Sequence, residues 1–249
     1  MLTPSEPIAE STSAAAAGCS TLAALEALIP TCSACPRLRS YCQQVAQTKV
    51  RRYATWTYWG RPVPGFGDPL ARIVVVGLAP AAHGGNRTGR MFTGDRSGDF
   101  LYAGLHRAGL ASQATSTDPS DGLSLRGVYI TAPCRCAPPA NLPTPAELAA
   151  CRPYLRRELA LLGEMRVLIA LGGLAHDSVL RLFAESGRTT GARPKFAHGA
   201  VHSLDGWLDR PQLQLVDCYH VSQQNTFTGR LTPAMLDAVL DQARALAMR

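Results

Sequence analysis

Residues 72–77 read Arg-Ile-Val-Val-Val-Gly, and a glycine-rich loop over Leu78–Gly94 and a predicted helix over Gly98–Leu110 follow them directly. A continuous run of β-branched residues is typical of a strand that is buried on both faces of a parallel sheet. Similar apolar runs predict three more strands, at residues 128–132, 167–171 and 213–217. Because helical patterns separate these strands, the sequence predicts a parallel sheet with helices on both faces.

The other helices are predicted from apolar periodicity and from their end residues. They lie over Thr21–Ile29, Arg37–Val50, Thr144–Leu162, Leu174–Ala184 and Thr232–Ala247. Proline at the first helical position and a threonine cap support the beginning of the last helix. In a parallel sheet, ligands bind at the carboxyl ends of the strands. We therefore expect three loops, residues 78–94, 133–141 and 220–230, to converge on one edge and form the site.

The first 20 residues are predicted to be a disordered tail, and residues 21–249 a single domain. The tail is no signal peptide, because it lacks a basic start and an apolar stretch and contains Glu6 and Glu10. No apolar run in the sequence reaches the ~18 residues that a membrane helix needs, which excludes a transmembrane protein. We therefore expect a cytoplasmic protein whose cysteines are reduced.

The basic residues gather in one segment. The chain has 25 basic and 18 acidic residues, a net charge of +7, and no acidic residue from Ala27 to Gly67. That segment interleaves its basic residues with tyrosines and tryptophans. Basic side chains between aromatic ones suit a polyanion whose bases can be stacked on, so nucleic acid is the expected partner. The arginine codons of a GC-rich genome are the alternative explanation.

Four of the eight cysteines form two pairs. Two residues separate Cys32 from Cys35, and fourteen separate Cys136 from Cys151. Two such pairs favour a site of four thiolates, which binds either Zn²⁺ or an iron–sulfur cluster. The spacing of the second pair fits zinc less well, and buried apolar cysteines are the remaining alternative. Cys134 is the closest rival of Cys136 as a ligand.

Two polar loops carry the candidate catalytic groups. Residues 78–94 hold two arginines, Arg87 and Arg90, with Arg96 close behind, but no Walker sequence and no dinucleotide-binding fingerprint. The chain also lacks the GxSxG motif of serine hydrolases and the HExxH motif of zinc proteases. His220 follows the fourth predicted strand. Its position at the carboxyl end of the sheet favours a catalytic over a structural histidine.

Long motifs in these loops resemble those of a known family. They are Gly77–Asp95 (GLAPAAHGGNRTGRMFTGD), Arg135–Asn141 (RCAPPAN), His220–Gly229 (HVSQQNTFTG) and Tyr58–Asp68 (YWGRPVPGFGD). The sequence resembles family 5, or type B, of the uracil-DNA glycosylase superfamily from about Cys32 to its end. The resemblance implies an α/β fold of three layers, α/β/α, with a central four-stranded parallel sheet. It also implies a base-excision repair enzyme that hydrolyses the N-glycosidic bond of deaminated bases in DNA.

The resemblance implies roles for residues of the loops. Phe92 matches the phenylalanine that stacks on the flipped base, and His220 is expected to stabilise the negative charge on the departing base. Ala79 stands where other branches carry the Asp or Asn that orients the hydrolytic water. Asn86 is then the nearest candidate for that role, and His83 is the second.

The specificity is expected to be broad. Ala132 stands where other branches often carry an Asn that reads the base, and Asn141 is the candidate that could contact the base instead. An alanine leaves no amide buried and unpaired when another base enters, so we expect hypoxanthine to be accepted besides uracil.

The resemblance also implies a cofactor and a DNA surface. The expected cofactor is a [4Fe–4S] cluster held by Cys32, Cys35, Cys136 and Cys151. The expected partner is DNA that contains uracil or other deaminated bases, bound by Arg51, Arg52, Arg87, Arg90 and Arg230.

We expect a monomeric and monofunctional enzyme. The only lysines, Lys49 and Lys195, lie outside the three loops, so no Schiff base can cut the strand. Two other functions stay open. One is an iron–sulfur or zinc protein that binds nucleic acid without catalysis and does not need His220. The other is an α/β hydrolase of small molecules whose arginines reflect codon use alone.

Overall fold

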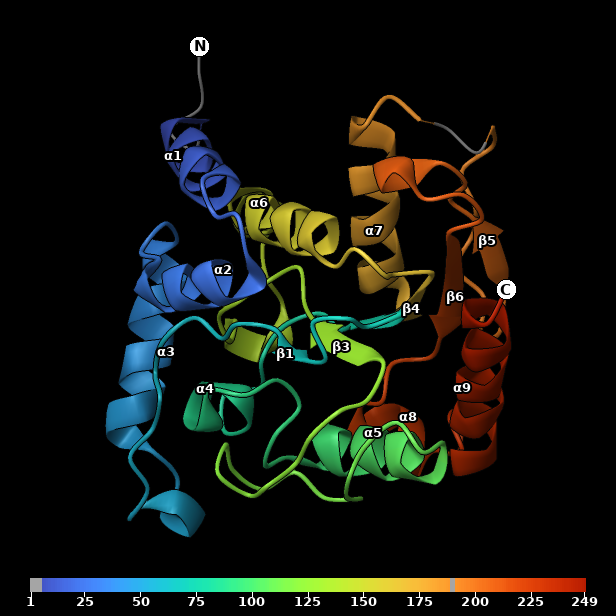
Figure 1. Ribbon diagram of the computed structural model, residues 1–249. Helices are drawn as coiled ribbons and strands as arrows, with labels where there is room; N and C mark the ends of the chain where they lie inside the picture. Colours follow the sequence, from blue (N-terminus) through green and yellow to red (C-terminus); the bar gives the residue numbers. More distant parts are fainter. Residues whose placement is uncertain (1–5, 189–190) are drawn as a thin grey trace.

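The computed structural model describes residues 6–188 and 191–249, and a six-stranded sheet in the order β1-β3-β2-β4-β6-β5 forms its centre (Figure 1). The strands are β1 (Phe66–Gly67), β2 (Ile73–Val76), β3 (Val128–Thr131), β4 (Val167–Leu171), β5 (Val201–Ser203) and β6 (Gln214–Cys218). The four central strands are parallel, which confirms the predicted fold class. The sequence did not predict β1 and β5, which pair antiparallel at the two edges.

The helices agree with the predicted ones to within a few residues, and the described part of the chain has three more. The α-helices are α1 (Glu6–Ala17), α2 (Leu22–Leu28), α3 (Pro36–Thr48), α4 (Gly85–Thr88), α5 (Arg96–Arg107), α6 (Pro145–Leu161), α7 (Gly173–Glu185), α8 (Gln223–Phe227) and α9 (Pro233–Ala247). The 3₁₀ turns are η1 (Ile29–Thr31), η2 (Arg51–Tyr53), η3 (Pro139–Asn141) and η4 (Trp207–Asp209). The short α4 and α8 lie inside the predicted loops, and α1 lies in the predicted tail.

The sheet buries both of its faces. Along β2, Ile73 and Val75 pack into one core with α5 and α9, and Val74 and Val76 pack into the other with α6 and α7. This alternation follows from the twofold repeat of a strand, and it explains why the whole run is apolar. Figure 1 shows α6 and α7 on one side of the sheet and α5 and α9 on the other.

The predicted disordered tail is the main correction to the fold. Instead, α1 occupies most of it and packs along α6, and Ala16 is buried beside Leu25, Ile29 and Tyr154. The side chain of Arg157 fixes the end of the segment, because its Nε donates to the carbonyl of Cys19 at 2.7 Å. The consecutive small residues Ala14, Ala15, Ala16 and Ala17 allow the two helices to approach closely. Residues 1–5 of the predicted tail lie outside the described residues.

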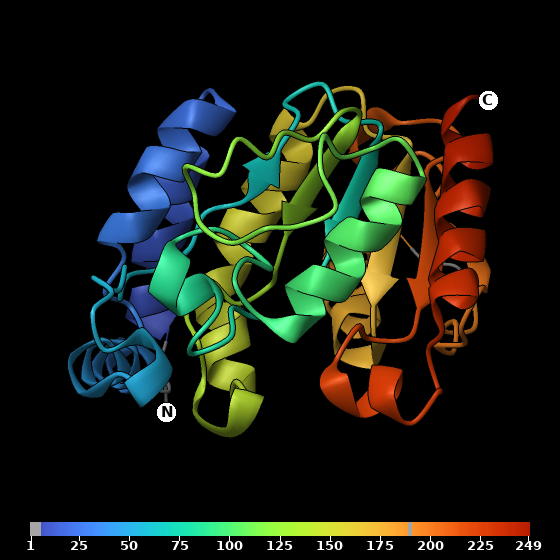
Figure 2. The ribbon, with the colours of Figure 1, turned by 90° about the horizontal axis from the view of Figure 1, so that it is seen from below.

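The carboxyl ends of the parallel strands lie at one edge of the molecule. In the view of Figure 2, η2, the beginning of α6 and α8 all lie along this edge. Among the residues that the structure describes, no helix is both long enough and apolar enough to cross a bilayer.

Candidate active site

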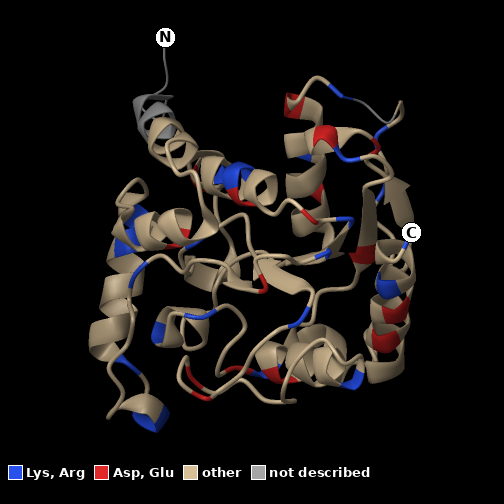
Figure 3. Cartoon of the chain, in the orientation of Figure 1, with Lys and Arg blue, Asp and Glu red and all other residues tan. Residues whose placement is uncertain are grey.

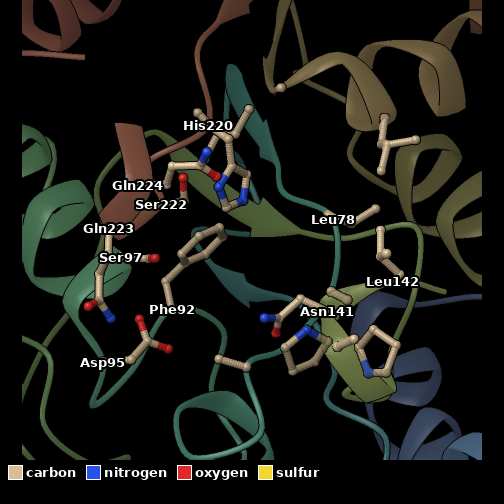
Figure 4. Close-up of a pocket in the computed structure, with 18 of the residues that line it drawn as sticks. Leu78, Phe92, Asp95, Ser97, Asn141, Leu142, His220, Ser222, Gln223 and Gln224 are labelled. Atoms are coloured by element: carbon tan, nitrogen blue, oxygen red, sulfur yellow. The ribbon is translucent and has the colours of Figure 1, made fainter. Parts of the chain in front are cut away.

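A cavity of about 660 Å³ opens at the carboxyl edge of the central strands (Figure 4). Its wall consists of residues from the loops after β2, β3, β4 and β6. The three loops that the sequence predicted to meet do meet here. The sequence did not predict the fourth segment of the wall, Leu171–Leu174 at the junction of β4 and α7, although two consecutive glycines at the end of an apolar run are a usable signal for it.

His220 lies in the wall of the cavity, half-buried. Its backbone is fixed because Asn225 Nδ2 donates to the His220 carbonyl at 2.8 Å. Gly172 leaves the room for it, since a Cβ there would lie 3.2 Å from His220 Cβ. Burial lowers the pKa of His220, so its imidazole is neutral at neutral pH and offers one N–H donor.

Phe92 also lies in the wall, and Figure 4 shows its ring between His220 and Asn141. Its backbone has φ of 52°, which is unusual for a residue with a side chain. Two glycines surround it closely. A Cβ on Gly77 would lie 2.8 Å from Phe92 Cζ, and one on Gly98 would lie 1.8 Å from the Phe92 carbonyl oxygen. The ring is therefore held in one position.

Ala79 and Asn141 complete the predicted cavity residues, and both lie in the wall. Ala140 and Asn141 have consecutive left-handed backbones, with φ of 53° and 57°. The sequence analysis gave no role to Asp95, which is an acidic residue of the wall. Asp95 caps α5 by accepting from the Gly98 N–H at 2.9 Å, and burial raises the pKa of its carboxyl.

Neither predicted candidate for holding the water lies in the wall of the cavity. Asn86 is fully buried in α4, and its Nδ2 donates to the carbonyls of Cys42 and Ala82 at 3.3 and 3.4 Å. His83 Nδ1 lies 3.1 Å from the hydroxyl of Tyr58. The prediction of Asn86 as a catalytic residue is therefore wrong, because the α4 turn aims its amide at backbone carbonyls.

Arg87 and Arg90 are buried and do not offer their charges to DNA, contrary to the prediction. Arg87 donates to the carbonyls of His83 and Gly94 at 2.8 and 2.9 Å. Arg90 forms an ion pair with Asp121 at 2.6 Å, and its side chain is 5% exposed. Both arginines shape the loop from inside. A count of charges along the sequence cannot separate such residues from free cations.

Arg51, Arg52 and Arg230, the other predicted DNA-binding residues, are exposed. Arg51 and Arg52 lie in η2, which carries blue in Figure 3. The Arg230 guanidinium lies over the Tyr219 ring, 4.7 Å from its centre. These cations are available to phosphates.

The four predicted ligand cysteines line one small second cavity. Cys32 and Cys35 come from the turn before α3, Cys136 from the loop after β3, and Cys151 from α6. Cys134 lines the same cavity, so it stays a rival of Cys136.

The surroundings of these cysteines fit a metal cluster. Burial, together with the neighbouring Cys151 and Cys32, raises the pKa of Cys35 to about 12, because thiolates so close together repel one another. A positively charged metal core removes that repulsion. The backbone N–H of Arg135 donates to Cys151 Sγ at 3.3 Å, as backbone groups do to the sulfurs of clusters.

A second group of metal-binding residue types consists of His176, His202 and Asp217. Asp217 is fully buried, and its two oxygens lie 2.8 Å from His176 Nδ1 and 2.9 Å from His202 Nε2. Both distances are those of hydrogen bonds, so the three side chains satisfy one another. Asp217 of β6 is thereby hydrogen-bonded to His176 of α7 and to His202 of β5, which links the three elements.

Comparison with known proteins agrees with this geometry. The family model of the uracil DNA glycosylase superfamily matches residues 64–244. The chain is 52% identical over 233 residues to the type-5 uracil-DNA glycosylase of Mycobacterium tuberculosis, covering 93% of this chain and 84% of the relative. It is 52% identical over 216 residues to the type-5 enzyme of Thermus thermophilus, covering 87% and 94%. A type-4 uracil-DNA glycosylase of Archaeoglobus fulgidus is 33% identical over 159 residues, covering 64% and 69%.

The match to the uracil DNA glycosylase superfamily, on a chain with Phe92, Asn141 and His220 around a cavity at the carboxyl edge of an α/β sheet, places the protein in the uracil-DNA glycosylase class. Within that class the chain belongs to family 5, the type-5 uracil-DNA glycosylases. The resemblance found in the sequence is thereby confirmed.

Proposed function

We propose that the protein is a DNA repair glycosylase that hydrolyses the N-glycosidic bond of uracil in DNA and leaves an abasic site. The observation that carries this proposal is that Phe92, Asn141 and His220 line one cavity in a chain of family 5. An enzyme that acts on a base must take it out of the stack into a pocket. The cavity of about 660 Å³ is large enough for a base.

His220 supplies the main catalytic interaction. Breaking the bond leaves negative charge on the departing base and positive charge on the sugar. A neutral imidazole donates its N–H where the negative charge develops, and it loses no proton in doing so. The lowered pKa of His220 supports this role. Phe92 stacks on the base, and water completes the hydrolysis at the anomeric carbon.

The base specificity is proposed to extend beyond uracil. Ala79 brings no polar side chain to the cavity, and Ala132 is buried in the core rather than in the wall. A pocket wall without a fixed amide at position 79, and with none reaching it from position 132, carries no penalty at these places for an unpaired group when hypoxanthine enters. A panel of duplexes with uracil, hypoxanthine and undamaged bases tests this breadth, and activity on uracil alone would contradict it.

The DNA is proposed to lie across the edge that carries the cavity. Arg51, Arg52 and Arg230 are exposed cations that can contact phosphates, which carry no sequence information. Arg87 and Arg90 have no part in this contact because they are buried.

The cysteine site is proposed to hold a [4Fe–4S] cluster with Cys32, Cys35, Cys136 and Cys151 as ligands. The cluster would cross-link the basic N-terminal segment to the loop after β3, so its role is structural. Anaerobically purified protein should be brown and contain iron and acid-labile sulfide. Stoichiometric zinc without sulfide would contradict this, and an intact cluster in Cys136→Ala would assign the fourth position to Cys134.

One assay separates the enzyme from the other two functions. A labelled uracil-containing duplex is incubated with the protein and then treated with alkali, which cleaves at abasic sites. We expect cleavage only after alkali, because none of the cavity residues is a lysine. Binding of the duplex without cleavage would favour the non-catalytic nucleic-acid-binding protein. The absence of both binding and cleavage would favour a small-molecule hydrolase. Monomeric state and cytoplasmic location stay predictions.

A further inference from the structure

Arg135 is a fully buried cation beside the cysteine site. It stands between Cys134 and Cys136, it lines the small cavity that the ligand cysteines surround, and it is 1% exposed. A charge buried so deeply needs partners for all of its donors.

Glu158 accepts hydrogen bonds only from the two Nη atoms of the Arg135 guanidinium. Nη2 donates to one carboxylate oxygen at 2.6 Å and Nη1 to the other at 3.3 Å. Glu158 also accepts hydrogen bonds from the hydroxyls of Tyr129 and Thr131, so it is held in place and its acceptor sites are filled. The ion pair is therefore rigid, and it fixes the direction of the whole guanidinium.

The Nε–H of Arg135 is left over by this arrangement. It is buried and has no hydrogen-bond partner among the described residues. Arg37 differs in this respect, because its Nε and Nη2 both donate to the Glu147 carboxylate at 2.8 Å and its Nε–H is therefore paired. A buried donor without an acceptor calls for an explanation, such as an ordered water, an ion or a bound group, and this donor belongs to a residue that lines the cysteine cavity.

We propose that Arg135 is a positioning residue of the cluster site and that its Nε–H donates to a sulfur of the bound iron–sulfur cluster. The inference rests on the proposed cluster. Its support is that Arg135 lines the cysteine cavity and that its backbone N–H already donates to Cys151 Sγ at 3.3 Å. One residue then supplies two N–H···S hydrogen bonds and a buried positive charge.

Such contacts favour the more negatively charged, reduced state of a cluster, and they protect the cluster from loss in air. Arg135→Lys keeps the charge and a partner for Glu158 but has no donor at the Nε position. We expect this variant to have a lower reduction potential than the wild type and to lose its cluster in air about tenfold faster. The shift of the Fe–S stretching bands in D₂O, measured by resonance Raman spectroscopy, should also become smaller.

Arg152→Lys is the matched control. Arg152 follows Cys151 directly, but its side chain pairs with Glu185 at 2.8 Å on the surface. The potential, the D₂O shift and the rate of cluster loss should equal those of the wild type.

Glu158→Gln provides a second test if Arg135→Lys does not fold. It leaves Arg135 in place and removes the negative charge that offsets it, so the reduction potential should rise and the D₂O shift should persist. If the wild type is fully loaded and Arg135→Lys has the same reduction potential and the same D₂O shift, the role of Arg135 is overturned but the cluster is not. An unchanged reduction potential in Glu158→Gln would have the same meaning. Wild-type protein without iron and sulfide would overturn the cluster itself.

Discussion

The guanidinium carbon of Arg87 lies 3.9 Å from the centre of the Tyr53 ring, and the Trp56 ring is 4.1 Å away. Arg87 thereby joins the basic and aromatic segment after α3 to the loop that carries Phe92. Its backbone carbonyl adds to the joint by accepting from the Trp59 N–H at 2.9 Å. A residue that looks like a DNA contact in the sequence instead joins the basic and aromatic segment to the loop that carries Phe92.

Replacing Arg87 by Met should destabilise the protein by about 3 kcal/mol, because two charge-assisted hydrogen bonds and two desolvated cation–π contacts are lost. Urea unfolding at constant pH measures the change. Arg51→Met is the control, because Arg51 is exposed and its loss should change the free energy of unfolding by less than about 0.5 kcal/mol. Equal effects of the two substitutions would show that Arg87 does not join the segments.

The ion pair of Arg90 and Asp121 predicts a loss of stability in acid. Burial by itself would raise the pKa of Asp121, but Arg90 and the N–H groups of Leu123 and Thr117 outweigh it and hold the pKa at about 2. The folded protein thus binds this proton less readily than the unfolded chain. The contribution to stability is complete above pH ~4 and is lost as the pH falls toward 2.

Asp121→Asn tests this dependence. At pH 7 the variant should be less stable by about 3 kcal/mol, because the buried guanidinium loses its counter-charge. Its thermal midpoint should change less with pH between 4 and 2 than that of the wild type. Parallel curves for the two proteins in this range would contradict the prediction.

The central strands and the meeting of their loops could be predicted, because buried β-branched runs and the position of loops after parallel strands are local signals. The edge strands β1 and β5 are too short to leave such a signal. The roles of Asn86, Arg87 and Arg90 could not be predicted either. A polar residue inside a polar loop reads as accessible in the sequence. Only the structure shows that the turn of α4 points Asn86 and Arg87 inward and that Asp121 holds Arg90 inside the loop.

Arg51 and Arg52 should account for part of the salt dependence of DNA binding. Each phosphate contact adds about −0.9 to the slope of log K against log salt on duplex DNA, so the double variant R51A/R52A should flatten the slope by up to about 1.8. Affinity should fall alike on all sequences. Fluorescence anisotropy of a labelled duplex across a salt series measures both quantities. Arg244→Ala is the control, because Arg244 is on α9 and does not line the cavity; an unchanged slope in R51A/R52A would refute the contact.

His220→Ala should reduce the single-turnover rate of uracil excision by at least ~10²-fold, which is the typical effect of losing one donor at a developing negative charge. Burial lowers the pKa of His220 below the ordinary histidine value of about 6.5. Titration of His220 should therefore cause no sigmoidal change in the wild-type rate between pH 6.5 and 8. His106→Ala, at an exposed position of α5, should keep the wild-type rate. A His220→Ala enzyme at full rate would remove the proposed mechanism.

Gly77→Ala should impair excision through Phe92 alone. The new Cβ would lie 2.8 Å from Phe92 Cζ and 2.9 Å from Cε2, so the ring has to move. The backbone of Phe92 cannot follow, because its carbonyl is packed against Gly98. Stacking on a base contributes about 1–3 kcal/mol, so the rate should fall about tenfold or more. Gly77 itself has no left-handed backbone, and the fold should be retained.

A double-mutant cycle makes this prediction specific. Phe92→Ala should lower the excision rate at least as much as Gly77→Ala does, because it removes the ring altogether. In the Phe92→Ala background, Gly77→Ala should then cost nothing further, since the atoms that its Cβ would meet are gone. Additive losses in the double variant would show that Gly77 serves the reaction by another route than the position of the Phe92 ring.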